Sequence, residues 1–278
     1  MYFAMDDMGD ENAKVLMETV SESEKWQMVH QFASGFGFTG IQLSEKYREV
    51  YGLSVVSIPD HIRSAFRLTY HIGGTHQLNT ADDEQHWYKM LSESLDIAKA
   101  VGAEDVSLHP PTLANRSRLP LPQNRESSIL SSKAKERLRI ILNRWLPEFQ
   151  SSGITLSLET HITPCVFAFG EIQEFRDFAL DLAGLGVLID ISHNYYDGFD
   201  VREVIASLVS LKITGLHLSD AVRGKKLHDG THLTAGQGYV NFKPLLALFH
   251  DNDAVYGALE VRGPARNISE SLACLQTL

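Results

Sequence analysis

The 278 residues are 44% hydrophobic and 22% charged, a composition typical of a globular protein with a large core. Only Cys165 and Cys274 occur, no apolar run approaches the roughly 20 residues of a membrane span, and the first residues lack a secretion signal, so we expect a cytoplasmic protein without disulfides or membrane contacts. The net charge of −10 disfavours nonspecific nucleic-acid binding, but bound cations can reverse the charge of an acidic site, so composition alone leaves nucleic acid open as a partner.

Eight short apolar runs predict buried β-strands, and a stretch with helical features follows each of them. The predicted strands are Met1–Asp6, Thr39–Leu43, Arg67–Ile72, Asp105–His109, Ile154–Leu158, Gly186–Ile189, Ile213–Leu218 and Val255–Leu259. Among the helical features, Thr80-x-x-Asp83 is a capping sequence, and the apolar stripe from Leu138 to Phe149 is the clearest in the chain. The stretch Ser44–Phe66 is poorly patterned, and we expect only short helical pieces there.

The regular alternation of strand and helix predicts parallel strands joined by helical crossovers. Eight such units in a chain of this length favour a closed (β/α)8 TIM barrel, built as one domain over residues 1–278. A doubly wound open sheet is the alternative. It is disfavoured because no glycine-rich phosphate loop follows an early strand.

Histidines and carboxylates stand at the carboxyl ends of six predicted strands. They are His71, His109, Glu159, Asp190, His217 and Glu260. In a barrel these ends converge on one mouth, which is where the chemistry of this fold is found. Three carboxylates buried at one mouth would repel one another unless a cation neutralised them. We therefore predict a metal site there.

Further histidines come from the loops at the same rim. His193 follows the sixth strand, and the polar loop after the seventh strand carries His228, Asp229 and His232. Imidazole and carboxylate ligands without thiolate suit Zn2+, Mn2+, Co2+ or Fe2+, and the sequence does not choose among them. One centre with positions open to substrate is expected from Glu159, Asp190, His217 and Glu260. The remaining histidines either bind further metal ions or hydrogen-bond a substrate, and these are His71, His109, His193 and His232.

These motifs resemble the xylose isomerase-like superfamily of TIM barrels, which includes metal-dependent sugar and sugar-phosphate isomerases and epimerases as well as endonuclease IV. The matching segments run in family order and are FTGIQL, YHIGG, VSLHP, LSLET, LIDISHNYYDG, LHLSD, DGTHLTAGQGYVNF and GALEV. The resemblance implies that Glu159, Asp190, His217 and Glu260 are shared metal ligands. It also implies roles at the metal centre for His71, His109, His193 and His232.

Two branches of the superfamily compete for this chain. Endonuclease IV is similar at nearly every ligand position, but its Asp-x-His in the last loop is Gly230-x-His232 here. Its Asn-Asp-Ser-Lys after the seventh-strand histidine is also replaced, by the four residues 219–222, which read Ser-Asp-Ala-Val. These departures and the acidic composition favour the isomerase and epimerase branch.

The expected function is therefore a divalent-metal-dependent isomerase or epimerase of a sugar, sugar phosphate or related keto-polyol. The resemblance implies that Glu159 and Glu260 exchange the proton next to a metal-bound carbonyl. Arg262 lies two residues after Glu260 and thus on the same face, where it can bind a substrate oxygen or pair with a carboxylate. The histidines expected to bind substrate are His71, His109 and His193.

Three other possibilities stay open from the sequence. The chain can be an endonuclease IV-like phosphodiesterase acting at abasic DNA, or a metal-holding barrel that binds without catalysis. Arg223, Lys225 and Lys226 can receive a substrate phosphate, although a solvated charge run in a loop is the simpler interpretation. Assembly into a homo-oligomer is compatible with everything above.

Overall fold

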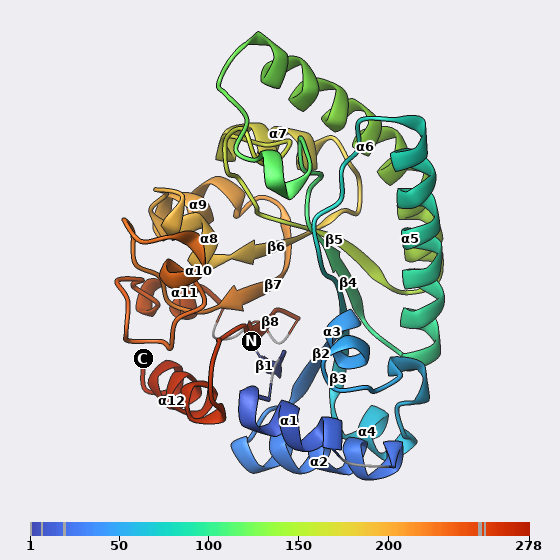
Figure 1. The fold of residues 1–278 in the computed structure, drawn as a ribbon, viewed down its shortest axis with the longest axis vertical. Coiled ribbons are helices and arrows are strands. Elements are labelled where there is room, and N and C mark those ends of the chain that lie inside the picture. The colour runs from blue at the N-terminus through green and yellow to red at the C-terminus, as the bar shows by residue number, and fades with distance from the viewer. Residues whose placement is uncertain (1, 7, 19–20, 250–251, 253) are drawn as a thin grey trace.

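Eight parallel strands form a closed barrel in the order β1 to β8 (Figure 1). A computed structural model describes residues 2–6, 8–18, 21–249, 252 and 254–278. The strands are β1 Tyr2–Met5, β2 Gly40–Ser44, β3 Arg67–Ile72, β4 Asp105–Leu108, β5 Thr155–Glu159, β6 Gly186–Asp190, β7 Lys212–Leu218 and β8 Tyr256–Leu259. This topology confirms the predicted (β/α)8 barrel and excludes the doubly wound open sheet.

All eight predicted strands are present, and each boundary inside the described residues differs from the prediction by at most one residue. Met1, at the start of the first predicted strand, lies outside the described residues. Strand β4 ends at Leu108, so His109 is the first residue of the loop rather than the last of the strand. Pro110 and Pro111 follow, and their missing N–H groups prevent the ladder from continuing.

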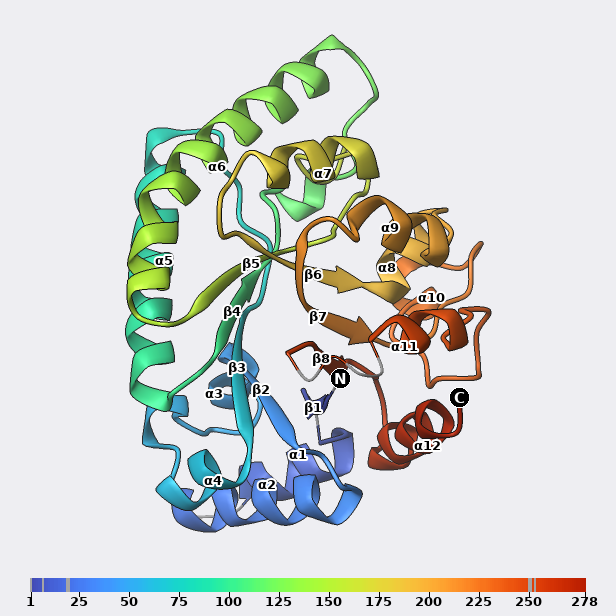
Figure 2. The same cartoon turned by 180° about the vertical axis from the view of Figure 1, so that it is seen from behind.

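Helices surround the strands, as the front and rear views show (Figures 1 and 2). They are α1 Asp10–Glu18, α2 Glu22–Phe36, α3 Glu45–Glu49, α4 Asp60–Ala65, α5 Ala81–Val101, α6 Arg125–Ser151, α7 Ile172–Leu180, α8 Ile191–Tyr196, α9 Val201–Leu208, α10 Leu227–Gly230, α11 Lys243–Phe249 and α12 Ala265–Gln276, with 3-10 turns η1 Val55–Ser57 and η2 Arg116–Arg118. Thr80 and Asp83 form the predicted capping box of α5. Within the described residues, no helix combines the length and apolar character needed to cross a bilayer.

The barrel floor, at the amino ends of the strands, is filled by side chains. Tyr2, Ala4, Leu188, Tyr256 and Ala258 form a buried cluster there. A Cβ atom at Gly215 would lie only 2.4 Å from the Tyr256 ring, so a glycine is needed for the ring to pack. Among the described residues, this end of the barrel is therefore filled by packed side chains.

A buried carboxylate is part of this floor. Asp105 accepts hydrogen bonds from the Ser157 hydroxyl and, at 3.1 Å, from the Tyr256 hydroxyl. Burial raises the pKa of Asp105 to about 6, because the charged form loses its hydration.

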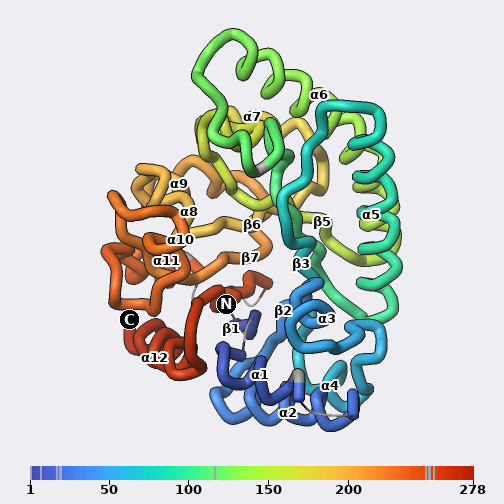
Figure 3. Tube along the Cα trace, viewed as in Figure 1, coloured from blue at the N-terminus to red at the C-terminus, as the bar shows by residue number. Residues whose placement is uncertain are grey.

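The two ends of the described chain close the barrel together. Strand β1 pairs with β8 from Tyr2 opposite Tyr256 to Met5 opposite Leu259. Figure 3 shows the blue amino-terminal and red carboxyl-terminal segments lying side by side along this seam. Just beyond it, the backbone N–H of Ala265 donates to the Glu11 carboxylate at 2.8 Å.

Candidate metal centre

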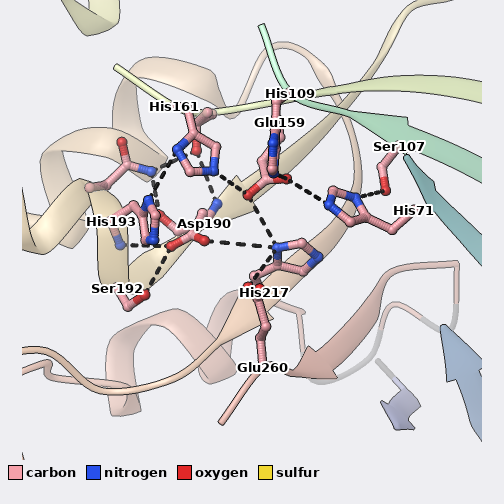
Figure 4. Close-up of polar contacts among 12 residues, drawn as sticks. His71, Ser107, His109, Glu159, His161, Asp190, Ser192, His193, His217 and Glu260 are labelled. Atoms are coloured by element: carbon pink, nitrogen blue, oxygen red, sulfur yellow. Dashed lines mark hydrogen bonds and ion pairs between the residues drawn. The ribbon is translucent and has the colours of Figure 1, made fainter. Parts of the chain in front are cut away.

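Alternation along the strands explains why the predicted site residues face one another. Side chains two positions apart in a strand point to the same side, so an inward series runs from Asp105 through Ser107 to His109 at the end of β4. The equivalent series ends at Glu159 on β5 and at Asp190 on β6. Figure 4 shows these ends converging with those of the neighbouring strands. The predicted residues drawn in this cluster are His71, His109, Glu159, Asp190, His193, His217 and Glu260.

The four predicted ligands of the main centre meet at one atom, Nδ1 of His217. This nitrogen lies 3.2 Å from Glu159 Oε1, 3.2 Å from Glu260 Oε2 and 3.8 Å from Asp190 Oδ2. Residues as far apart in the sequence as Glu159 and Glu260 are thus neighbours, as the barrel prediction requires. Glu159, Asp190 and His217 are buried, whereas the Glu260 side chain is 31% exposed and opens toward the mouth.

Gln42, on β2, fixes which nitrogen of His217 faces the carboxylates. Its Oε1 lies 3.1 Å from His217 Nε2, and a carbonyl oxygen only accepts, so Nε2 carries the proton. In the neutral ring, Nδ1 then presents a lone pair to three carboxylates. Asp190 Oδ2 is also buried without a hydrogen-bond partner among the described residues. This donor set, with lone pairs converging and no thiolate, fits a divalent cation. Gln42 was not among the predicted site residues, because an amide flanked by apolar residues in a strand resembles core.

The second oxygen of Glu159 faces another set of imidazoles. Oε2 lies 3.2 Å from His109 Nε2 and 3.9 Å from His71 Nε2. Two further contacts hold these rings in place. His109 Nδ1 lies 2.6 Å from the Gly74 carbonyl, and His71 Nδ1 lies 3.0 Å from Ser107 Oγ. The structure therefore brings both predicted histidines to the central glutamate.

His161 belongs to the site and was missed from the sequence. Its Nε2 lies 2.9 Å from Glu159 Oε1, and the side chain is buried. The signal was present, because His161 is two residues after Glu159 and alternation places both on one side. Beyond it, Nδ1 of His161 faces Nδ1 of His193 at 3.0 Å, and Nε2 of His193 faces Nε2 of His232 at 3.0 Å.

Electrostatics keep the two glutamates ionised. Burial raises the pKa of Glu159, but His217 and His109 outweigh it and hold that pKa well below its usual range. The pKa of Glu260 is also held well below its usual range, because His232 and His217 outweigh burial. Burial disfavours a charged His217, yet Glu159 and Glu260 raise its pKa well above the ordinary value. A bound cation would take the place of that proton.

The outer imidazoles respond differently. Burial lowers the pKa of His71 to about 3, and it also lowers the pKa values of His161 and His193. At His109 the charge of Glu159 outweighs burial and raises the pKa. Neutral imidazoles and ionised carboxylates are the forms that ligate metals, so most of the cluster is ready to bind a cation near neutral pH.

Comparison with known proteins decides the family. The family description "xylose isomerase-like TIM barrel" matches residues 31–278. The chain belongs to this family. No sequence among curated proteins matches it.

Three solved structures match this chain over its whole length. A 3-keto-D-glucoside 4-epimerase from E. coli shares 17% identity with a TM-score of 0.68, and each chain is covered to 100%. A D-tagatose 3-epimerase-like protein shares 16% identity with a TM-score of 0.69, covering 100% of this chain and 99% of the other. A family 2 AP endonuclease from Brucella melitensis shares 14% identity with a TM-score of 0.68 over 100% and 99% of the two chains. At such identities the likeness establishes the fold alone.

In this xylose isomerase-like barrel, some residues of the loop after β7 reach the metal-ligand cluster and others do not. His232 lies 3.6 Å from Glu260 Oε2 through its Nδ1. His228 and Asp229 are exposed and contact each other, so these two residues of the loop lie away from the cluster. A Cβ atom at Gly230 would lie 2.7 Å from the Val222 carbonyl, so the loop as folded has no room for an aspartate there.

Asp220, just after β7, holds the same loop through hydrogen bonds to its backbone. Its buried carboxylate accepts four backbone N–H groups, from Ala221 and Val240 on Oδ1 and from Gly236 and Gly238 on Oδ2, at 2.8–2.9 Å. Its backbone also exchanges two hydrogen bonds with Leu233. Because Leu233 is next to His232, Asp220 ties that imidazole to the end of β7.

The predicted substrate-binding arginine lies at the mouth. Arg262 lines a cavity of about 80 Å³ together with Glu260, His232, Asp6 and Lys46. Its guanidinium donates to the His228 carbonyl at 2.8 Å, which holds it beside the loop. A larger cavity of about 560 Å³ lies against α5, and none of the predicted metal ligands lines it.

Proposed function

We propose that the protein is a divalent-metal-dependent isomerase or epimerase of a small sugar or related keto-polyol. The observation that carries this proposal is the approach of Glu159 and Glu260 to the same nitrogen of His217, each at 3.2 Å. Two ionised carboxylates flanking one position can remove a proton from a carbon and return it from another direction. The sugar epimerases among the structures of the same fold give this chemistry a precedent.

Glu159, Asp190, His217 and Glu260 would hold the metal ion, with Zn2+, Mn2+, Co2+ and Fe2+ all compatible with the donor set. When bound, the ion supplies Lewis-acid stabilisation of negative charge on a substrate oxygen. Glu260 is partly exposed at the mouth and exchanges a proton with substrate entering from there. Glu159 does so from the buried side, where the N–H of His161 orients it.

Several neighbouring groups are suited to hold a polyol. His109 and His193 have ring nitrogens that face the cluster, and His71 lies beside them. Arg262 at the mouth can donate to a substrate oxygen from the open side. These contacts would orient the carbon that loses its proton between the two glutamates.

A neutral sugar fits the loop better than a phosphorylated one. The Arg223 guanidinium donates to the carbonyls of Tyr195 and Phe199 and lies 4.3 Å from the Tyr195 ring centre. These contacts indicate that Arg223 holds the loop to α8 and is not a free phosphate-binding group. The net charge of −10 also disfavours a DNA substrate.

Hydrogen exchange tests the proposal directly. The protein, saturated with Mn2+, Co2+ or Zn2+, is incubated in D2O with a panel of ketopentoses and ketohexoses, and NMR follows deuterium entering the carbon next to the carbonyl. We expect exchange and epimerised product with at least one sugar. Glu159→Gln and Glu260→Gln should each reduce the exchange rate by at least a hundredfold, on the order of general acid–base contributions.

The matched control is Glu270→Gln, which changes an exposed glutamate on α12. It should leave the exchange rate unchanged. Exchange that survives both active-site substitutions would disprove the two-glutamate mechanism. Cleavage of a duplex containing an abasic site, with no exchange in any sugar, would replace the proposal with a phosphodiesterase.

A further inference from the structure

The inner imidazoles of the cluster differ in the group that contacts their outer ring nitrogen. His109 and His217 each place one ring nitrogen against a carbonyl-type oxygen, which only accepts and therefore keeps a proton on that nitrogen. His71 places its Nδ1 3.0 Å from Ser107 Oγ instead (Figure 4). A hydroxyl either donates or accepts, so this contact alone leaves the proton of His71 on either nitrogen.

The other nitrogen of His71 has no hydrogen bond that would hold the proton. Nε2 lies 3.9 Å from Glu159 Oε2, which is too long for a hydrogen bond. Burial lowers the pKa of His71 to about 3, so the ring carries a single proton near neutral pH. The position of that proton is therefore decided by Ser107 and by the groups that Ser107 contacts.

A chain of buried hydrogen bonds leads from Ser107 to Asp105 in the barrel floor. The Tyr256 hydroxyl hydrogen-bonds with Ser107 and donates to Asp105 Oδ2 at 3.1 Å, and all three side chains are buried. Burial raises the pKa of Tyr256 well above its ordinary value, so the phenol keeps its proton. Because the pKa of Asp105 is about 6, its carboxylate is ionised at pH 7.5 and only accepts.

The charge of Asp105 gives this chain one direction. Tyr256 has a single hydroxyl proton and donates it to Asp105, so the Tyr256 oxygen is left to accept the proton of Ser107. Ser107 Oγ then accepts the Nδ1 proton of His71, and the Nε2 lone pair points toward Glu159. The opposite direction would leave the oxygens of Ser107 and Tyr256 facing each other with no proton between them.

We propose that Asp105 is a positioning residue for the metal centre, acting through Tyr256 and Ser107 to keep the proton of His71 on Nδ1. The hydrogen bond at one ring nitrogen decides which nitrogen is free to ligate, so Nε2 is available to a cation or to a substrate hydroxyl. An ionised carboxylate buried at this depth costs stability, and the direction of the chain gives it a role. The tautomer of His71 is independent of which reaction the site catalyses.

Nitrogen NMR reads the tautomer directly. Long-range proton–nitrogen spectra of the full 15N-labelled chain are recorded at pH 7.5, as purified and after a chelator removes bound metal, and His71→Gln identifies the His71 signals. The wild type should carry the proton on Nδ1 in both samples. In Tyr256→Phe, Ser107 has only the His71 ring to donate to, so after chelation the proton should move to Nε2. Asp105→Leu should give the same result, because Tyr256 then donates to Ser107 and Ser107 to the ring.

The matched control is Tyr2→Phe, which removes a hydroxyl from the ring beside Tyr256 that is not part of the chain. It should keep the wild-type tautomer. Circular dichroism establishes that each variant is folded, and if either Tyr256→Phe or Asp105→Leu unfolds, the other decides. A wild-type His71 protonated on Nε2 would overturn the proposal. A folded Tyr256→Phe or Asp105→Leu protein with the proton still on Nδ1 would do so equally.

Discussion

The Asp220 carboxylate and the four backbone N–H groups that donate to it form a cradle for the loop after β7. We expect Asp220 to be among the positions of the fold where a substitution costs the most stability. Replacing Asp220 with asparagine keeps its size but exchanges one oxygen for an NH2 group. That group then faces two of the four backbone N–H donors, so two hydrogen bonds are lost. Hydrogen bonds to a charged acceptor contribute about 1.5–3 kcal/mol each, so we expect a loss of about 3–6 kcal/mol when the amide faces the buried N–H groups of Ala221 and Val240. The loss lies at the lower end of this range when the amide faces the less buried N–H groups of Gly236 and Gly238.

Urea denaturation followed by circular dichroism measures this loss. For a chain of this size, about 2–4 °C of melting temperature corresponds to 1 kcal/mol, so a drop of roughly 6–24 °C is expected in thermal melting. The two backbone hydrogen bonds between residue 220 and Leu233 do not depend on the side chain, so His232 should keep its position and metal binding should change little. The control is Asp229→Asn on the same loop, where the carboxylate is exposed and contacts His228, and it should change stability by less than about 0.5 kcal/mol. An Asp220→Asn protein within about 1 kcal/mol of the wild type would refute the cradle.

Further predictions address the loop, the barrel floor and the metal ligand. Gly238→Ala places a Cβ atom 2.3 Å from Asp220 Oδ1 and should destabilise the protein by about 1–3 kcal/mol in urea denaturation, whereas Gly35→Ala, in open space on α2, should stabilise it by up to about 1 kcal/mol. Folding raises the pKa of Asp105 from 3.8 to about 6, so between these pH values the folded chain holds a proton that the unfolded chain has released. The contribution of Asp105 to stability is therefore complete below pH 3.8 and is lost as the pH rises through about 6. The free energy of unfolding of Asp105→Asn should therefore exceed that of the wild type by up to about 3 kcal/mol at pH 7.5 but not at pH 3.5. Equal stability differences at the two pH values would contradict this prediction. Gln42→Leu removes the contact that orients His217 and should weaken metal binding about 10–100-fold by calorimetry, and unchanged affinity would exclude that role.

The sequence predicted the barrel well because its strongest signals are local. Most strands are short apolar runs that end at a proline, a glycine or a charged residue, and the side chains at the carboxyl ends of parallel strands meet at one end of the barrel. That logic placed Glu159, Asp190, His217 and Glu260 together before any distance was known, and the structure brings all four to one nitrogen.

The parts that were missed depend on side-chain orientation beyond a strand end. His161 lies two residues after Glu159, just beyond the end of β5, and the alternation that places it inward was not extended past the strand. Gln42 looked like a strand residue in an apolar run. Residue type alone does not tell on which side of a loop a side chain lies, and His228 and Asp229, in the same loop as His232, are exposed.

Because β1 pairs with β8, the barrel closes late in the synthesis and folding of the chain. The contact between Glu11 and Ala265 joins residues 254 positions apart, so a ribosome must release nearly the whole chain before the first strand finds its last neighbour. Glu260 arrives with that same strand. Until then the mouth offers Asp190 and His217 without their third partner, and a cation captured early would favour the closed ring over the open one. If the proposed cation binds, its supply during synthesis would raise the yield of closed barrel.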